Sequence, residues 1–121
     1  MAEKEQWEEL ARAERQLVYE KEELEDKKRS IDRLDEAYQE HFFQTAALFQ
    51  SAYDLIAGEK EDQYLVEECA EQIQRKQRNL SEMMEEEQEN IAKEHYSLNE
   101  KEDELFYQKK RWMTEKEEES R

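Results

Sequence analysis

Apolar residues recur at every seventh position along the first half of the chain. One heptad column is apolar in five successive repeats: Leu10, Leu17, Leu24, Ile31 and Tyr38. The companion column is mostly charged up to Ile31, and beyond it the apolar surface widens over three neighbouring columns. A strict seven-residue period is typical of a helix in a left-handed coiled coil. The pattern therefore predicts one long helix over about residues 5–57.

The second half of the chain mirrors the first. Val66, Ile73 and Leu80 follow one column, and a neighbouring column then continues towards the end of the chain through Met84, Ile91, Leu98, Leu105 and Trp112. This pattern predicts a second helix over about residues 62–118.

A turn at about residues 58–62 is predicted to join the two helices. Gly58 is the only glycine in 121 residues, and there is no proline. Glycine commonly ends a helix because it enters the left-handed conformation without a Cβ penalty. We assign Ile56 and Gly58 to the turn and expect Asp62 to cap the second helix by accepting from its first free amides.

The two patterns align when the helices run antiparallel. A single alignment pairs Leu24 with Leu98 and Ile31 with Ile91, and its midpoint falls in the predicted turn. The expected fold is therefore all-α: residues 1–121 form one antiparallel two-helix hairpin.

The apolar band beside the turn is wider than one facing helix can cover. Burying a large apolar side chain contributes roughly 1.5–3 kcal/mol, whereas ordering one residue costs on the order of 1–2 kcal/mol. A lone hairpin would thus be marginal, and we expect it to pack into a four-helix bundle with a partner. The sequence leaves open which apolar residues form the internal seam and which bind the partner; the candidates for partner binding are Phe42, Phe43, Leu48, Phe49, Tyr53, Leu55, Tyr64, Leu65 and Met83.

Composition narrows the classes of partner. Charged residues make up 45% of the chain and the net charge is −16, which argues against binding to nucleic acid or an anionic membrane. No apolar run approaches the roughly 20 residues that span a bilayer, and the acidic start of the chain is unlike a signal peptide. We expect a cytoplasmic protein without membrane insertion; whether it is exported with its partner stays open. The single cysteine, Cys69, is interpreted as a small core residue beside the turn.

Catalytic, metal and cofactor sites are not predicted. A di-metal bundle needs Glu-x-x-His on facing helices, but the residues three before His41 and His95 are Tyr38 and Ala92. A single glycine also rules out a glycine-rich phosphate loop. The protein is expected not to be an enzyme.

Two further motifs have alternative interpretations. Trp7 and Trp112 should meet at the open end of the hairpin, either to close it or to form a partner-binding aromatic cluster with Phe106 and Tyr107. The stretch Tyr96–Glu100 matches Tyr-x-x-x-Asp/Glu, which a glutamate-rich chain also contains by chance.

An acidic hairpin of this size with a glycine in its turn resembles the small WXG-type proteins of bacterial type VII secretion. Ile56-Ala57-Gly58 stands where those proteins carry Trp-x-Gly. The chain is more similar to the small α-helical proteins encoded beside LXG toxins in Gram-positive bacteria, which lack that motif. The resemblance implies a targeting factor or chaperone that binds the helical N-terminal domain of a toxin, together with a sister hairpin, for export by the type VIIb machinery.

Departures from the family's pattern refine this expectation. Ile56 replaces the turn tryptophan, and the match at Tyr96–Glu100 lies in the paired part of the second helix rather than in a free tail. Phe-x-x-x-Asp, the signal expected of the sister protein, does not occur. The resemblance thus implies the partner that stabilises the toxin. Two alternatives stay open: a stalk-like coiled-coil component of an export ATPase, similar to the flagellar FliJ-type hairpin, and a homo-oligomeric structural coiled coil.

Overall fold

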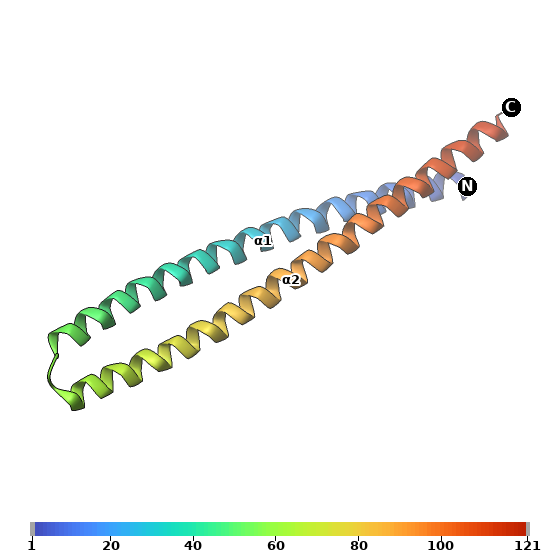
Figure 1. Cartoon of the computed structure of the whole chain (residues 1–121). Coiled ribbons are helices and arrows are strands. Elements are labelled where there is room, and N and C mark those ends of the chain that lie inside the picture. Colours follow the sequence, from blue (N-terminus) through green and yellow to red (C-terminus); the bar gives the residue numbers. More distant parts are fainter. Residues whose placement is uncertain (1, 121) are drawn as a thin grey trace. The chain divides into compact units, whose positions relative to one another are not determined.

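Two long helices make up almost the whole structure (Figure 1). The computed structural model describes residues 2–120, with side chains from Glu3 onwards. Helix α1 spans Ala2–Leu55 and helix α2 spans Lys60–Glu119. The described residues contain no strand. The predicted all-α helical hairpin is confirmed.

The helices are long because nothing in either half of the sequence interrupts them. Proline is absent, and the chain is rich in Glu, Lys, Gln, Leu and Ala, which are strong helix formers. Side chains four residues apart add support on the exposed faces. These pairs are hydrogen-bonded or ionic: Gln16–Glu20, Gln39–Asp35, Gln44–Glu40, Gln50–Asp54 and Arg75–Glu71.

The turn is tighter than predicted and lies slightly earlier in the chain. The Glu59 amide donates to the Ile56 carbonyl at 3.1 Å, which closes a four-residue turn. Gly58 is its third residue and has a φ of 101°. Because the turn closes within four residues, α2 begins at Lys60 and Asp62 is its third residue. The prediction that Asp62 caps this helix is therefore wrong: Glu59 precedes the first helical residue.

Gly58→Ala is expected to lower the free energy of unfolding by about 1–2 kcal/mol, the cost of the left-handed conformation for a residue with a Cβ. A Cβ at this position would meet nothing within 4 Å, so the cost is conformational and not steric. Gly58→Asn should cost less, since asparagine tolerates this region better. Urea unfolding followed by circular dichroism measures both variants, and equal stability of Gly58→Ala and the wild type would contradict the assignment.

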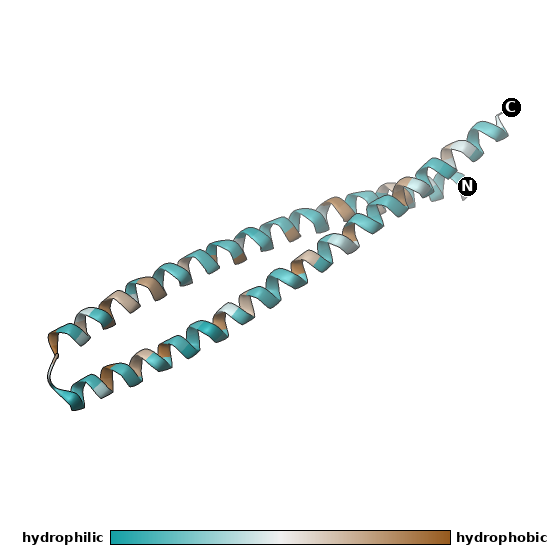
Figure 2. Ribbon diagram, in the orientation of Figure 1, coloured by the Kyte–Doolittle hydropathy of each residue, from teal (hydrophilic) through white to brown (hydrophobic). Residues whose placement is uncertain are grey.

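Packing between the helices divides the chain into two units, which are described separately. The open-end unit comprises Met1–Lys28 and Glu89–Arg121, and the turn unit comprises Arg29–Gln88. Within each unit a stretch of α1 runs antiparallel to a stretch of α2 (Figure 1). Figure 2 shows apolar positions recurring between hydrophilic ones along both helices.

The open-end unit holds the most completely buried residues. Its core consists of leucine and isoleucine from the predicted heptad columns: Leu17, Leu24, Ile91 and Leu98. Two ion pairs join the helices beside this core, Lys21 with Glu102, and Lys109 with Glu14 at 2.9 Å. The aliphatic stems of such long side chains cover apolar surface while their charged ends stay in water. A seam with a polar companion column can therefore still exclude water.

The turn unit has the wider apolar band but less burial. Met84 is its one buried residue among the large apolar side chains described. Phe42, Phe49 and Tyr53 are half-buried, whereas other apolar residues of the band are exposed. The apolar columns extend beyond the face that the neighbouring helix covers. The structure thus leaves apolar surface uncovered where the sequence predicted a partner.

Candidate interaction surfaces

An open groove lies between the helices of the turn unit and has a volume of about 290 Å³. We call it the turn groove and define it by its apolar lining: Phe42, Ala46, Phe49, Tyr53, Val66, Ala70 and Ile73. Small side chains at Ala46 and Ala70 leave room between the aromatic rings. Its polar lining is Gln50, Glu67, Gln74 and Gln77, so one carboxylate is the only charged group in it.

A second apolar surface follows a single heptad column of α1. Leu48 and Leu55 are 71% and 86% exposed, and Leu34 precedes them in the same column. Met83 on α2 is also exposed and directly precedes the buried Met84, just as Leu48 precedes the half-buried Phe49. In an antiparallel pair, equivalent positions beside the seam lie on the same side. We call Leu34, Leu48, Leu55 and Met83 the leucine flank.

The leucine flank and the turn groove open on different sides of α1. At 3.6 residues per turn, Leu48 and Leu55 point about 140–160° away from Tyr53. Ala46 lies on the same side as Tyr53, about 160° from Leu48. The turn unit therefore offers apolar surface on both sides of its helix pair.

The segment of α1 that contributes residues to both surfaces has no charged side chain. Residues 41–53 contain no Asp, Glu, Lys or Arg, in a chain that is 45% charged. Its outward positions are Phe43, which is 77% exposed, and residues such as Gln44 and Ala47. A helix face exposed to water is usually charged, and a helix without such a face is usually covered. This segment has the character of a helix that is enclosed by others.

The structure divides the nine residues predicted to bind a partner into two groups. Three are half-buried and line the turn groove: Phe42, Phe49 and Tyr53. Six are exposed: Phe43, Leu48, Leu55, Tyr64, Leu65 and Met83. Exposure is compatible with a binding role for all six, which stays a prediction. The residues predicted to bind a partner did not include Leu34, Ala46 or Ala70, although Leu34 shares the heptad column of Leu48.

Cys69 does not belong to the core. It is exposed, so the prediction of a small core residue is wrong. It directly precedes Ala70 and therefore occupies the column beside the seam, which the opposite helix does not cover. Within residues 2–120, no group of three or more His, Cys, Asp or Glu side chains is placed to hold a metal ion.

The Tyr96–Glu100 match has an ordinary helical geometry. Tyr96 is exposed, and a hydrogen bond to Glu100, together with its negative charge, raises the pKa of the phenol. Tyr19 and Glu23 have the same spacing, and Glu23 raises the pKa of Tyr19 in the same way. A tyrosine and a glutamate four residues apart meet on any helix. The geometry therefore does not distinguish this pair as a signal, and its role in export stays a prediction.

Trp7 and Trp112 meet in the open-end unit as predicted. Their ring centroids are 4.8 Å apart, with the rings tilted by 36°. The Lys109 ammonium lies 5.1 Å from the Trp7 centroid, and the Lys116 ammonium lies 4.6 Å from that of Trp112. The ring centroids of Phe106 and Tyr107 are 5.8 Å apart. These two side chains point about 120–140° away from Trp112 around the helix. The four aromatic residues therefore do not form the single cluster considered from the sequence.

In two places, two carboxyl groups lie within hydrogen-bonding distance of each other. A hydrogen bond with Glu3, together with the negative charge of Glu3, raises the pKa of Glu119 above its usual 4.5. Asp62 acts on Glu59 in the same way beside the turn. An acid whose pKa is raised by folding binds its proton more tightly in the folded state. The stability that this proton contributes is complete below the unfolded pKa and is lost as the pH rises through the folded pKa.

The melting temperature is therefore expected to rise as the pH is lowered from 7 to about 5, because folding raises the pKa of both carboxyl groups. The double variant Glu3→Gln with Glu59→Gln removes both repulsions and should have a flatter pH dependence than the wild type. Thermal unfolding followed by circular dichroism across this range measures both. An unchanged slope in the double variant would show that these pairs do not contribute.

The helices of residues 2–120 include none that is long and apolar enough to cross a membrane. A family model described as a protein of unknown function (DUF3958) matches residues 5–112. The chain belongs to the DUF3958 family. The match includes the turn and most of both helices. No curated protein and no solved structure matches the chain.

Proposed function

We propose that this DUF3958 hairpin is a non-enzymatic targeting factor, or chaperone, for an LXG-type toxin. It binds the helical N-terminal domain of the toxin, together with a sister hairpin, in the cytoplasm before export by the type VII secretion system. The observation that supports the proposal is the uncharged segment 41–53, which has the leucine flank on one side and the turn groove on the other.

Binding would proceed by burial of helix against helix. An amphipathic helix laid along the leucine flank would cover side chains that contribute roughly 1.5–3 kcal/mol each when fully buried. A helix that binds only the folded hairpin also stabilises it by mass action. The hairpin and the toxin domain would thus stabilise each other. A chaperone acts on its client in this way, by favouring the folded state of the client.

Self-association explains the same surfaces less well. A second copy would bring another net charge of −16 against the first, and charge of one sign keeps proteins apart. A toxin domain or sister hairpin with basic residues beside its apolar stripe would not meet this repulsion. The same argument applies equally to any partner of lower negative charge, including an export ATPase.

The test is co-expression of the hairpin with the N-terminal domain of the toxin and the sister hairpin, followed by affinity purification and light scattering. The expected result is a complex that contains each chain in a fixed ratio. A stable homodimer that does not bind the toxin domain would overturn the proposal in favour of a structural coiled coil. Binding to a hexameric export ATPase instead would favour the stalk-like alternative.

A further inference from the structure

An aromatic and basic patch lies on α2 in the open-end unit and shares no residue with the turn groove or the leucine flank. We define it as Phe106, Tyr107, Lys110 and Met113. Phe106 and Tyr107 are 62% and 60% exposed, and Met113 is exposed as well. Lys110 lies three or four residues from each of the other three, so one helix face carries all four side chains. Lys110 is thus surrounded by three apolar side chains.

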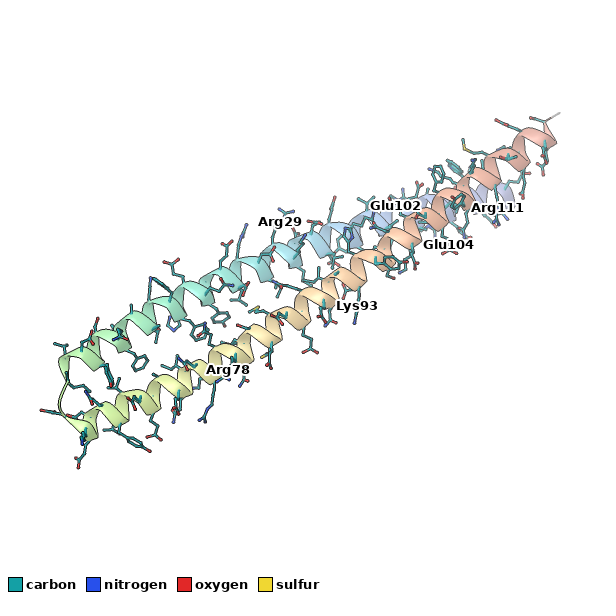
Figure 3. All side chains as sticks on the ribbon, in the orientation of Figure 1. Arg29, Arg78, Lys93, Glu102, Glu104 and Arg111 are labelled. Atoms are coloured by element: carbon teal, nitrogen blue, oxygen red, sulfur yellow. The ribbon has the colours of Figure 1, made fainter. Side chains whose placement is uncertain are left out.

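The charge around this patch is opposite to that of the chain. Residues 105–114 contain no Asp or Glu, although Asp and Glu make up 35 of the 121 residues. Three consecutive basic residues, Lys109, Lys110 and Arg111, fall within this stretch. Figure 3 shows Arg111 on α2 in the open-end unit, with Glu104 and Glu102 further towards the N-terminus of the helix.

These cations differ in what they contact. Lys109 pairs with Glu14 and lies over the Trp7 ring, so it serves the packing of the two helices. Arg111 lines a hollow beside Trp112 with Glu115. Lys110 forms an ion pair with no residue in the described range 2–120. The cation at the centre of the apolar patch therefore has its charge available to a partner.

The fold does not require this patch. Phe106 and Met113 point about 120° and 100° away from Trp112, which lies in the seam. Their substitution by charged residues would cost little packing, and most outward positions of this helix are indeed charged. These exposed apolar side chains around a cation contribute little to the stability of the hairpin. They are more typical of a surface that binds another molecule.

We propose that this patch binds an acidic segment of another polypeptide, one that presents an Asp or Glu carboxylate beside a large apolar side chain. The carboxylate pairs with the Lys110 ammonium, and the apolar side chain packs against Phe106 and Met113. Binding hot spots are rich in aromatic residues, and apolar surroundings that exclude water strengthen a charge pair.

Charge also argues against a second copy and against a membrane. A two-fold contact centred on this patch would place Lys110 against its own equivalent. A two-fold contact elsewhere would bring a second net charge of −16 against the first. An anionic bilayer is a plane, and it would have to approach Asp103 and Glu117, which lie about two helical turns on either side of Lys110 on the same face of the helix. A single peptide segment can avoid these carboxylates.

The probe is a displayed library of random 20-residue helical peptides, selected on the full-length hairpin and counter-selected on its Lys110→Glu variant. Selected peptides should be enriched in Asp or Glu next to aromatic or aliphatic residues. Their affinity, measured by fluorescence anisotropy, should fall at least about tenfold in Phe106→Ala and in Lys110→Glu, as expected for hot spots. Lys93→Glu is the matched control, since it makes the same charge change at an exposed position of the same helix, and it should alter affinity less than about twofold.

Recovery of no peptide that depends on Phe106 and Lys110, or of predominantly basic ones, would overturn the proposal. Sedimentation with vesicles of anionic phospholipid tests whether the patch binds a membrane instead. Binding to these vesicles that is abolished by both Phe106→Ala and Lys110→Glu would also overturn the proposal. Circular dichroism shows whether each variant remains helical. The patch and the turn unit are tested separately, because a hairpin with Leu48→Glu and Leu55→Glu should still bind the selected peptides.

Discussion

Replacing Leu24 by alanine is expected to lower the free energy of unfolding by about 2–5 kcal/mol, the range for a buried leucine. Leu24 is 5% exposed and borders the same hollow between the helices as Leu98. The open-end unit has one apolar layer per heptad, and charged side chains flank each layer. A lost layer cannot be replaced by neighbouring apolar contacts, so we expect a value well above the lower limit.

Val18→Ala is the control for this substitution. Val18 lies on the same helix in the same unit but is 56% exposed, so its truncation should change stability by no more than about 0.5 kcal/mol. Urea unfolding followed by circular dichroism measures both variants. Similar losses of stability in the two would contradict the assignment of the core to the Leu24 column.

The second large effect concerns binding. Glutamate at both Leu48 and Leu55 is expected to abolish complex formation with the toxin domain, because each charge would have to be buried or the interface would have to open. Both side chains are largely exposed in the hairpin, so the helices should form as in the wild type. Co-purification measures the binding, and circular dichroism measures the helicity.

The matched variant is Val18→Glu, which places the same charge at an exposed apolar position of the open-end unit. It should leave complex formation intact. If the Leu48 and Leu55 double variant still co-purifies with the toxin domain, the leucine flank is not the binding surface. If the double variant and Val18→Glu both lose binding together with helicity, the surfaces contribute to folding instead.

The heptad columns were sufficient to predict the fold because a seven-residue spacing keeps apolar side chains on one face of a helix. Leu17 and Leu24 are seven residues apart, as are Met84, Ile91 and Leu98, and these five are the buried apolar residues of the described chain. The lone glycine located the turn for a comparable reason: a φ of 101° favours glycine over all other residues. Periodicity and backbone conformation are local properties that a single sequence displays.

Other features depend on contacts that periodicity does not encode. The depth of burial in the open-end unit depends on how Lys21 and Glu102 lie over the seam. Asp62 was predicted to cap α2 because aspartate is a common cap, but the hydrogen bond that closes the turn sets the start of the helix. Cys69 was assigned to the core from its residue type, although its column lies beside the seam and leaves the side chain exposed. The identity of the partner depends on another chain altogether.

The most direct measurement is hydrogen exchange of the backbone amides, in the free hairpin and in the complex with the toxin domain and the sister hairpin. If segment 41–53 is enclosed by partner helices, its amides should exchange at least about tenfold more slowly in the complex, since binding suppresses local opening. Equal exchange in this segment, with protection elsewhere, would contradict the claim that the turn unit binds the partner.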